Sequence, residues 1–243
     1  MKLIFLGCLS NSRYKDTCAN AIKIIQHIDN QFETVQDVPC CGSLSYQITD
    51  IERMRDHVNY VNDWLQTQDV TELVTICAGC YNYFTKYYPK ILGEKFKVKI
   101  QHILQFLAKN LEKLDLKNPN KKYGVSYHDA CHLRNAHIPI IKEPRLIIES
   151  IEGIEFREME INREFSICCG AGGGVYSIFK ENSDFNANAI FKQMKKSKLL
   201  LTACPFCYTA FKRVRDEQNL RRSVMKFEDF IAKLIFEKGE GII

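Results

Sequence analysis

One stretch of the sequence occurs twice. It reads Val74-Thr-Ile-Cys77-Ala-Gly-Cys80-Tyr-Asn-Tyr-Phe84 in the first half of the chain and Leu201-Thr-Ala-Cys204-Pro-Phe-Cys207-Tyr-Thr-Ala-Phe211 in the second. The threonine, both cysteines, the tyrosine and the phenylalanine recur at a constant offset of 127 residues. Such agreement predicts two copies of one structural unit.

The remaining cysteines follow the same two copies. The chain has 11 cysteines in 243 residues, and all except Cys18 fall into two sets of the form C–CC–CxxC, each with a glycine after the cysteine pair. The sets are Cys8, Cys40, Cys41, Cys77, Cys80 with Gly42, and Cys131, Cys168, Cys169, Cys204, Cys207 with Gly170. We predict a first repeat over residues 1–118 and a second over 119–243, joined near the polar stretch 116–122.

Hydrophobic periodicity predicts that each unit alternates three strands with helices. Ile100, Ile103 and Leu104 align with Phe227, Phe230 and Ile231 at the offset of 127, in the closing amphipathic helices. Asp50 and Asp184 are expected to cap the middle helices. The predicted strands are Leu3–Leu6, Phe32–Val38, Leu73–Ile76, Tyr123–Tyr127, Ile154–Met159 and Lys198–Leu201, and the predicted helices are Thr17–Ile28, Asp50–Gln66, Ile103–Leu114, Pro144–Ile151, Asp184–Lys196 and Met225–Phe236.

This alternation predicts an α/β fold of two pseudo-symmetric repeats, each a small parallel sheet flanked by helices. Every cysteine cluster then follows a strand. We therefore expect the clusters at the carboxyl ends of the strands, where open α/β sheets bind ligands.

Composition narrows the class of protein. A hydrophobic share of 46% and a charged share of 26% are those of a globular domain and exclude a disordered chain. The net charge of +5 comes without a dense basic stripe, so we expect no nucleic acid as partner. We also expect no membrane span and no secretory signal, because the apolar run Leu3–Leu6 is too short for either. A cytoplasmic location follows, where spaced cysteines indicate metal or redox chemistry before disulfides.

Five cysteines at one sheet edge favour a cofactor with several metal atoms. A CxxC pair alone fits zinc, iron–sulfur or redox chemistry equally. Adjacent cysteine side chains diverge, however, and five thiolates exceed the four that close a zinc site. The glycines Gly170, Gly172 and Gly173 let the backbone approach a bulky inorganic group. We predict an iron–sulfide cluster in each unit; zinc in one unit, or a zinc-stabilised interaction domain, is the alternative.

The two-fold spacing C–x₃₁–CC–x₃₅–CxxC and C–x₃₆–CC–x₃₄–CxxC resembles the cysteine-rich CCG domain family. Within it, the chain is most similar to the B subunit of heterodisulfide reductase and its homologues, and the likeness covers essentially the whole chain. Tyr127-His-Asp-Ala-Cys-His132 and Cys168-Cys-Gly-Ala-Gly-Gly-Gly174 also look like family signatures. The resemblance implies two non-cubane [4Fe–4S] clusters, each held by one set of five cysteines.

The resemblance also implies functions. Family members reduce a disulfide between the two clusters with electrons from a ferredoxin-like iron–sulfur subunit, so a disulfide or related thiol/disulfide substrate is expected. The same domain occurs in glycolate, lactate, glycerol-3-phosphate and succinate or fumarate complexes. The alternative is therefore a non-catalytic electron-transfer subunit that serves a flavoprotein subunit and a quinone, in the cytoplasm or peripheral to the membrane through partner subunits.

Several other residues have two interpretations. His128 and His132 flank Cys131 and either act on a cluster sulfur as proton donors or cap the strand end. Arg134 and Arg145 either bind an anion or lie on the solvated surface, which we favour. We expect Tyr81 and Tyr208 to pack over the clusters, and Cys18 to be a buried core thiol.

Overall fold

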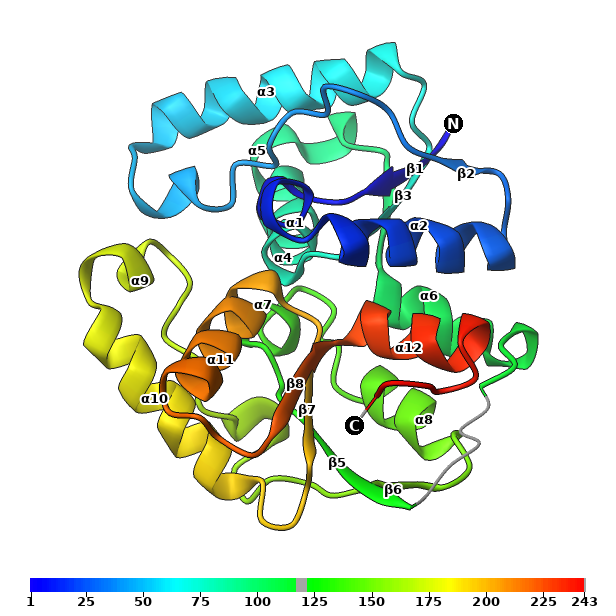
Figure 1. Ribbon diagram of the computed structural model, residues 1–243. Coiled ribbons are helices and arrows are strands. Elements are labelled where there is room, and N and C mark those ends of the chain that lie inside the picture. Colours follow the sequence, from blue (N-terminus) through cyan, green and yellow to red (C-terminus); the bar gives the residue numbers. More distant parts are fainter. Residues whose placement is uncertain (117–121, 243) are drawn as a thin grey trace.

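Two four-stranded parallel sheets organise the molecule. The computed structural model describes residues 1–116 and 122–242 (Figure 1). The strand order is β2-β1-β3-β4 in the first sheet and β6-β5-β7-β8 in the second, and every neighbouring pair is parallel. The strands are β1 (Lys2–Phe5), β2 (Phe32–Glu33), β3 (Glu72–Thr75), β4 (Lys99–His102), β5 (Tyr123–Tyr127), β6 (Ile154–Phe156), β7 (Leu199–Thr202) and β8 (Ser223–Lys226).

Helices flank both sheets in the same order, which confirms the predicted fold class. The first unit contains α1 (Cys8–Arg13), α2 (Lys15–Ile28), α3 (Ile51–Thr67), α4 (Ala78–Lys86), α5 (Tyr88–Leu92) and α6 (Ile103–Lys109). The second contains α7 (Cys131–Arg134), α8 (Glu143–Glu149), α9 (Val175–Ile178), α10 (Lys180–Gln193), α11 (Pro205–Glu217) and α12 (Phe227–Phe236). The junction predicted at 116–122, with its boundary between 118 and 119, lies outside the described residues except for its two ends.

Of the two predicted helix caps, one is confirmed and one is wrong. Asp50 precedes α3, and its Oδ1 accepts a hydrogen bond of 2.8 Å from the backbone N–H of Arg53. Asp184 lies inside α10 and forms an ion pair with Arg213. The helix begins a turn earlier, and this places Ser183 in the interior, where its hydroxyl donates to the carbonyl of Cys169.

The fourth strand of each sheet was not predicted, because its few apolar residues also fit the helix that follows. Met225 belongs to β8, and α12 begins at Phe227. Since α6 begins at Ile103, the closing helices are offset by 124 residues, and the alignment of Ile103 with Phe230 at 127 is wrong. Three residues are close to one helical turn, so the apolar pattern matches in either register. The predicted strands Phe32–Val38 and Ile154–Met159 are also shorter in the structure.

The two units exchange packing contacts through equivalent helices. Helix α12 packs against α2 of the first unit, and α6 packs against α8 of the second (Figure 1). The carboxylate of Asp229 accepts hydrogen bonds from Thr17 Oγ1 at 2.8 Å and from Asn20 Nδ2 at 2.9 Å. One cluster of buried apolar side chains includes residues of both units. This shared core fixes the position of each cysteine set relative to the other.

Candidate metal centres

Each cysteine set lies at the carboxyl edge of one sheet. In the first unit, Cys8 is the first residue of α1, directly after β1, and Cys77 immediately precedes α4, directly after β3. Cys131 and Cys204 occupy the same places at α7 and α11. The cysteine pairs lie in the loops that follow β2 and β6. The strand order reverses between β1 and β3, and between β5 and β7, so the sets lie where doubly wound sheets bind ligands.

The cysteine sulfur atoms approach one another in the same pairs in both units, and all the cysteines are free thiols. The Sγ atoms of Cys8 and Cys40 are 3.7 Å apart, and those of Cys41 and Cys80 are 3.2 Å apart. In the second unit the distance is 3.7 Å between Cys131 and Cys168 and 3.2 Å between Cys169 and Cys207. Within residues 1–116 and 122–242, no three His, Cys, Asp or Glu side chains are grouped so that they could hold a single metal ion. Paired thiols suit several metal atoms better than one tetrahedral ion.

Ionisation of the thiols in each cysteine set favours binding of a positively charged group. The pKa of Cys40 is lowered to about 2, because its Sγ forms hydrogen bonds with the thiols of Cys41 and Cys8 and accepts one from the N–H of Gly42 at 3.5 Å. The pKa of Cys8 is raised by its bond to Cys40 and by burial. One thiol of the set therefore ionises easily. Ionisation of the neighbouring thiols is opposed by the negative charge already present on the first. Several iron ions would remove that repulsion, so the donor set fits an iron–sulfide group.

The second set shows the same electrostatics. Hydrogen bonds with the thiols of Cys131 and Cys169, together with one from the N–H of Gly170 at 3.4 Å, lower the pKa of Cys168 to about 2. The pKa of Cys131 is raised by the bond to Cys168 and by burial. Gly42 and Gly170 thus each direct a backbone amide at a cysteine sulfur.

Two glycines leave no room for a side chain beside the thiols. A Cβ on Gly42, where φ is +87°, would lie 2.7 Å from Cδ2 of His57. A Cβ on Gly7, where φ is +78°, would lie 3.1 Å from Cβ of Cys77. The other two predicted glycines, Gly172 and Gly173, have different neighbours. They lie beside His132 and Gln47, where the two units meet.

Three side chains that the sequence did not indicate hold the cysteine-pair loops. His57 Nε2 lies 2.8 Å from the carbonyl oxygen of Cys40, and the hydroxyl of Tyr88 donates to the carbonyl of Cys41 at 3.0 Å. Ser183 donates to the carbonyl of Cys169 at 3.1 Å. These residues lie on α3, α5 and α10, far from the cysteines in sequence, and no spacing rule connects them to the motif.

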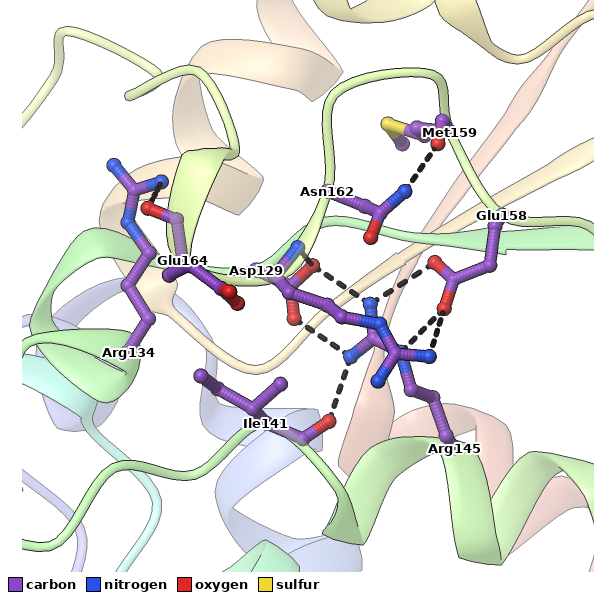
Figure 2. Close-up of polar contacts among 9 residues, drawn as sticks. Asp129, Arg134, Ile141, Arg145, Glu158, Met159, Asn162 and Glu164 are labelled. Carbon is purple, nitrogen blue, oxygen red and sulfur yellow. Dashed lines mark hydrogen bonds and ion pairs between the residues drawn. The ribbon is translucent and has the colours of Figure 1, made fainter.

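A buried ion-pair network supports the loop that carries Cys131 (Figure 2). Arg145 donates to both carboxylate oxygens of Asp129, at 2.8 and 2.9 Å, and also pairs with Glu158. Its side chain is 5% exposed, so the prediction that Arg145 lies on the solvated surface is wrong. Its carboxylate partners are 13 and 16 residues away in sequence, so no local pattern indicates the pairing. The backbone N–H of Arg163 adds a third donor to Asp129, at 2.7 Å.

The two flanking histidines have different surroundings. His128 is buried, and its Nε2 lies 2.9 Å from the carbonyl oxygen of Ile167, next to Cys168. Burial lowers its pKa, so the ring is neutral and donates to that carbonyl. His132 instead faces the first unit and lines a cavity there. Arg134 donates to the carbonyl oxygens of Glu164 and Ser166, which holds the loop before Cys168.

Tyr81 and Tyr208 each reach the opposite unit. The hydroxyl of Tyr81 donates to the carbonyl of Ile138 at 3.0 Å. The ring of Tyr208 meets that of Tyr14 edge to face, with centroids 5.1 Å apart. Both tyrosines therefore contribute to the contact between the units.

A cavity of about 370 Å³ opens between the first cysteine set and the second unit. The first unit contributes all five of its cysteines, and the second contributes His132, Gly173 and Phe206. Each of these three residues lies in a loop that carries cysteines of the second set: His132 follows Cys131, Gly173 follows the Cys168–Cys169 pair, and Phe206 lies inside the CxxC. The remaining lining residues are Leu9, Ser12, Ser43, Leu44, Gln47 and Gly79. One cavity therefore borders the loops of both sets.

Comparison with known proteins gives a consistent picture. The profile of the CCG cysteine-rich domain matches twice, over residues 3–85 and 125–212. The D subunit of dihydromethanophenazine:CoB–CoM heterodisulfide reductase from Methanosarcina acetivorans is 28% identical over 239 residues, 93% of this chain and 56% of that protein. The B subunit of a fumarate reductase (CoM/CoB) from Methanothermobacter marburgensis is 30% identical over 218 residues, 89% of this chain and 42% of that protein. An uncharacterized iron–sulfur protein of Methanocaldococcus jannaschii is 30% identical over 242 residues, 95% of this chain and 46% of that protein.

The chain spans about half the length of these curated relatives. Among the described residues, no helix combines the length and the apolar character that crossing a bilayer requires.

Proposed function

We propose, from the premise that this chain belongs to the CCG family of cysteine-rich domains, that it is an iron–sulfur oxidoreductase subunit with one cluster in each unit. Cys8, Cys40, Cys41, Cys77 and Cys80 would hold the first cluster, and Cys131, Cys168, Cys169, Cys204 and Cys207 the second. The paired thiols support a non-cubane [4Fe–4S] type over zinc, since zinc needs only four thiolates around one ion. When bound, such clusters supply one-electron transfer.

The reaction we propose is reduction of a disulfide, or of a related thiol/disulfide substrate, to thiols. One observation supports it above the others: a single cavity borders the cysteine-bearing loops of both units. Cleavage of a disulfide needs two electrons, and two one-electron centres beside one cavity can deliver them without releasing a half-reduced product. The name of the Methanosarcina relative, which is part of a heterodisulfide reductase, agrees with this proposal.

The chain's own residues have supporting roles. The amides of Gly42 and Gly170 stabilise negative charge on sulfur, and the Arg145–Asp129 pair fixes the loop that carries Cys131. His132 is the lining residue able to move a proton to a departing thiolate, and His128 positions the loop before Cys168. The electrons would come from a ferredoxin-like iron–sulfur subunit or a flavoprotein subunit in the cytoplasm.

The second candidate is electron transfer to or from a quinone, without disulfide cleavage. The mostly apolar lining of the cavity, with Leu9, Leu44 and Phe206, favours it, because such walls suit a planar apolar ring. A subunit of a succinate, fumarate, lactate or glycolate complex would work in this way, and the name of the Methanothermobacter relative agrees with it.

The test is carried out on anaerobically purified, iron-loaded protein. We expect about eight iron and eight sulfide per chain if each unit holds a four-iron cluster, and two paramagnetic signals on reduction. Reduced viologen should drive turnover of small disulfides, and Cys77→Ser or Cys204→Ser should remove it together with one of the two signals. A colourless protein with bound zinc and no acid-labile sulfide would contradict the proposal, and activity with quinones alone would establish the second candidate.

A further inference from the structure

We propose that a basic hollow at the amino edge of the second sheet is a docking site for an acidic segment of a partner polypeptide. The hollow lies between the turn that joins α10 to β7 and the turn that joins α11 to β8 (Figure 1). This inference goes beyond the proposed function, because it concerns a surface that contains no cysteine and is independent of the reaction that the cysteine sets perform.

Six cations and no acidic residue line this basic hollow, which has a volume of about 890 Å³. The lining residues are Lys195, Lys196, Lys198, Arg215, Leu220, Arg221, Arg222 and Ser223. They come from two segments that β7 and most of α11 separate in the sequence. Positive charges gathered in one concave surface repel one another and together attract an anion, so the folded chain presents a site for negative charge.

The two basic turns are fixed against each other by one arginine. The Nη2 of Arg222 donates to the carbonyl of Lys195 at 2.7 Å, and its Nη1 donates to the carbonyl of Ser197. Lys195 and Asn219 both have left-handed backbone conformations, with φ of +49° and +50°, which set the shape of the two turns. The hollow is therefore formed before any partner binds.

Two of the six cations have a carboxylate partner at the rim. Lys195 lies 3.4 Å from Glu160, and Arg215 lies 2.6 Å from its neighbour Asp216. Neither carboxylate belongs to the lining. Exposed pairs of this kind contribute little and exchange easily for another anion.

The other three cations are available to a partner. Lys196, Lys198 and Arg221 are exposed, and none of them forms an ion pair with another residue of the described chain. Glu155 attracts Lys196 only as a minor cause of its lowered pKa, because its carboxylate accepts two hydrogen bonds from Arg157. A segment with several carboxylates would supply the missing counter-charge.

The first unit shows that the fold does not require this charge. Its equivalent hollow, at α3 and the segment before β4, has a volume of about 520 Å³ and contains two lysines, one aspartate and three amides. Its lining residues are Asn59, Asn62, Asp63, Gln66, Val70, Lys95, Lys97 and Val98. Since the same elements assemble there without an excess of cations, the basic hollow is a property of the second unit alone.

Shape and composition favour an acidic polypeptide over other anions. The lining contains no aromatic side chain on which a nucleic acid base could stack. A flat membrane surface does not reach cations that line a concave surface. The three available cations are exposed, which suits the flexible carboxylates of a polypeptide better than a small phosphate ligand enclosed by buried donors.

The basic hollow lies away from the thiols. Lys198 directly precedes β7, and Cys204 comes after the other end of that strand. A strand of four residues alone spans about 13 Å. A partner docked here therefore leaves the cavity beside the cysteine sets open.

The experiment measures binding of charge-matched probes to the purified protein by fluorescence anisotropy. A capped hexaglutamate peptide with a neutral dansyl label should bind at low ionic strength, a hexaglutamine peptide should not, and added salt should weaken the binding. The combined change Lys196→Glu, Arg221→Glu should weaken it by about tenfold or more. The control is Lys95→Glu, Lys97→Glu, which changes the net charge equally at the equivalent hollow of the first unit and should leave the affinity unchanged.

Two further measurements do not depend on the folding of the charge-reversed protein. Lys196→Gln, Arg221→Gln introduces no negative charge and should weaken binding in the same direction. In wild-type protein, a carbodiimide joins carboxylates to lysines that they contact. Peptide mass mapping should place the cross-links at Lys195, Lys196 or Lys198.

Each other outcome would overturn the docking site. Equal weakening by the control, or cross-links at Lys95 and Lys97, would show that net charge alone attracts the peptide. Tighter binding of inorganic pyrophosphate, a six-base oligothymidylate or phosphatidylglycerol vesicles through the same residues would identify a different occupant, and no binding of hexaglutamate would remove the site altogether. None of these measurements detects electron transfer, so failure of the proposed function and failure of this inference are distinguishable.

Discussion

Lys226 and Glu228 form an ion pair with no exposed surface, at the start of α12. The Nζ of Lys226 lies 3.6 Å from Oε2 of Glu228, and neither side chain makes a hydrogen bond to another described residue. Lys226 directly precedes α12, as His102 directly precedes α6, and both are fully buried. Burial together with the positive charge of Lys226 lowers the pKa of His102 to about 3. The positive charge of Lys226 is therefore placed inside the contact between the units.

The first prediction concerns removal of that charge. Lys226→Met should destabilise the fold by about 3–5 kcal/mol, because the carboxylate of Glu228 is left buried and unpaired. The double variant Lys226→Met, Glu228→Gln should recover most of the loss. Melting temperatures measured on anaerobic, iron-loaded protein check this, and a single variant as stable as the wild type would contradict the pairing.

The same variant should change the dependence of stability on pH. Burial raises the pKa of Glu228, and the charge of Lys226 opposes that rise. Without Lys226 the pKa rises further. A raised carboxyl pKa gives stability that is present at low pH and is lost as the pH rises through the folded-state value. When the pH is raised from 6 to 8.5, the melting temperature of Lys226→Met should therefore fall by more than that of the wild type. The melting temperature of the double variant should not show this extra fall.

Arg145 provides the second prediction. Arg145→Met leaves Asp129 buried without its two charged donors, and should cost about 3–5 kcal/mol and loosen the loop that carries Cys131. Arg157→Met is the matched control, because its partner Glu155 is half exposed and such surface pairs contribute little to stability. We expect iron and sulfide per chain to fall toward half in Arg145→Met alone. Full iron content in that variant would show that the network does not support the second site.

The spacing of the cysteines along the sequence predicted their arrangement, because it follows the order of strands and helices in the fold. A cysteine after each strand of a parallel sheet must lie at the carboxyl edge, whatever the loop lengths, so Cys8, Cys77, Cys131 and Cys204 could be placed from the pattern alone. The repeat then indicated that both units share one fold.

What the sequence did not predict depends on contacts between distant segments. Strands β4 and β8 are four residues long, and their apolar side chains fit the helical period of the segments that follow. Asp184 resembles a helix cap locally, but α10 begins at Lys180, so Asp184 lies inside the helix. Arg145 finds partners 13 and 16 residues away, and the place of His132 in the first unit's cavity depends on how the units pack.

Gly42 provides the third prediction. Gly42→Ala adds a Cβ only 2.7 Å from the His57 ring, at a φ of +87°, and should destabilise the loop that carries Cys40 and Cys41. Gly93→Ala is a control for backbone strain alone, because φ is +58° there and no atom lies within 4 Å of the added Cβ. The control should cost about 1–3 kcal/mol, because φ +58° with ψ −133° is a backbone conformation that residues other than glycine rarely adopt, and it should retain full iron content. Gly42→Ala should cost more and lose iron from the first site, and equal behaviour of the two variants would contradict the close approach.

The last prediction separates Cys18 from the other ten cysteines. Cys18 is 4% exposed on α2, and burial raises its pKa to about 11, so it stays protonated at pH 7 and behaves as a small apolar side chain. Cys40 has its pKa lowered to about 2, with donation from Cys41 as the main cause, so it is a thiolate in metal-free protein. Iodoacetamide at pH 7 should therefore label Cys40 in native, metal-free protein and leave Cys18 unlabelled, as peptide mass mapping would show. Cys18→Ala should cost about 1 kcal/mol and keep all the iron, whereas Cys40→Ala should lose iron from the first unit. Full iron in Cys40→Ala would mean that Cys40 is not a ligand of the first site, and loss of iron in Cys18→Ala would mean that Cys18 is more than a core side chain.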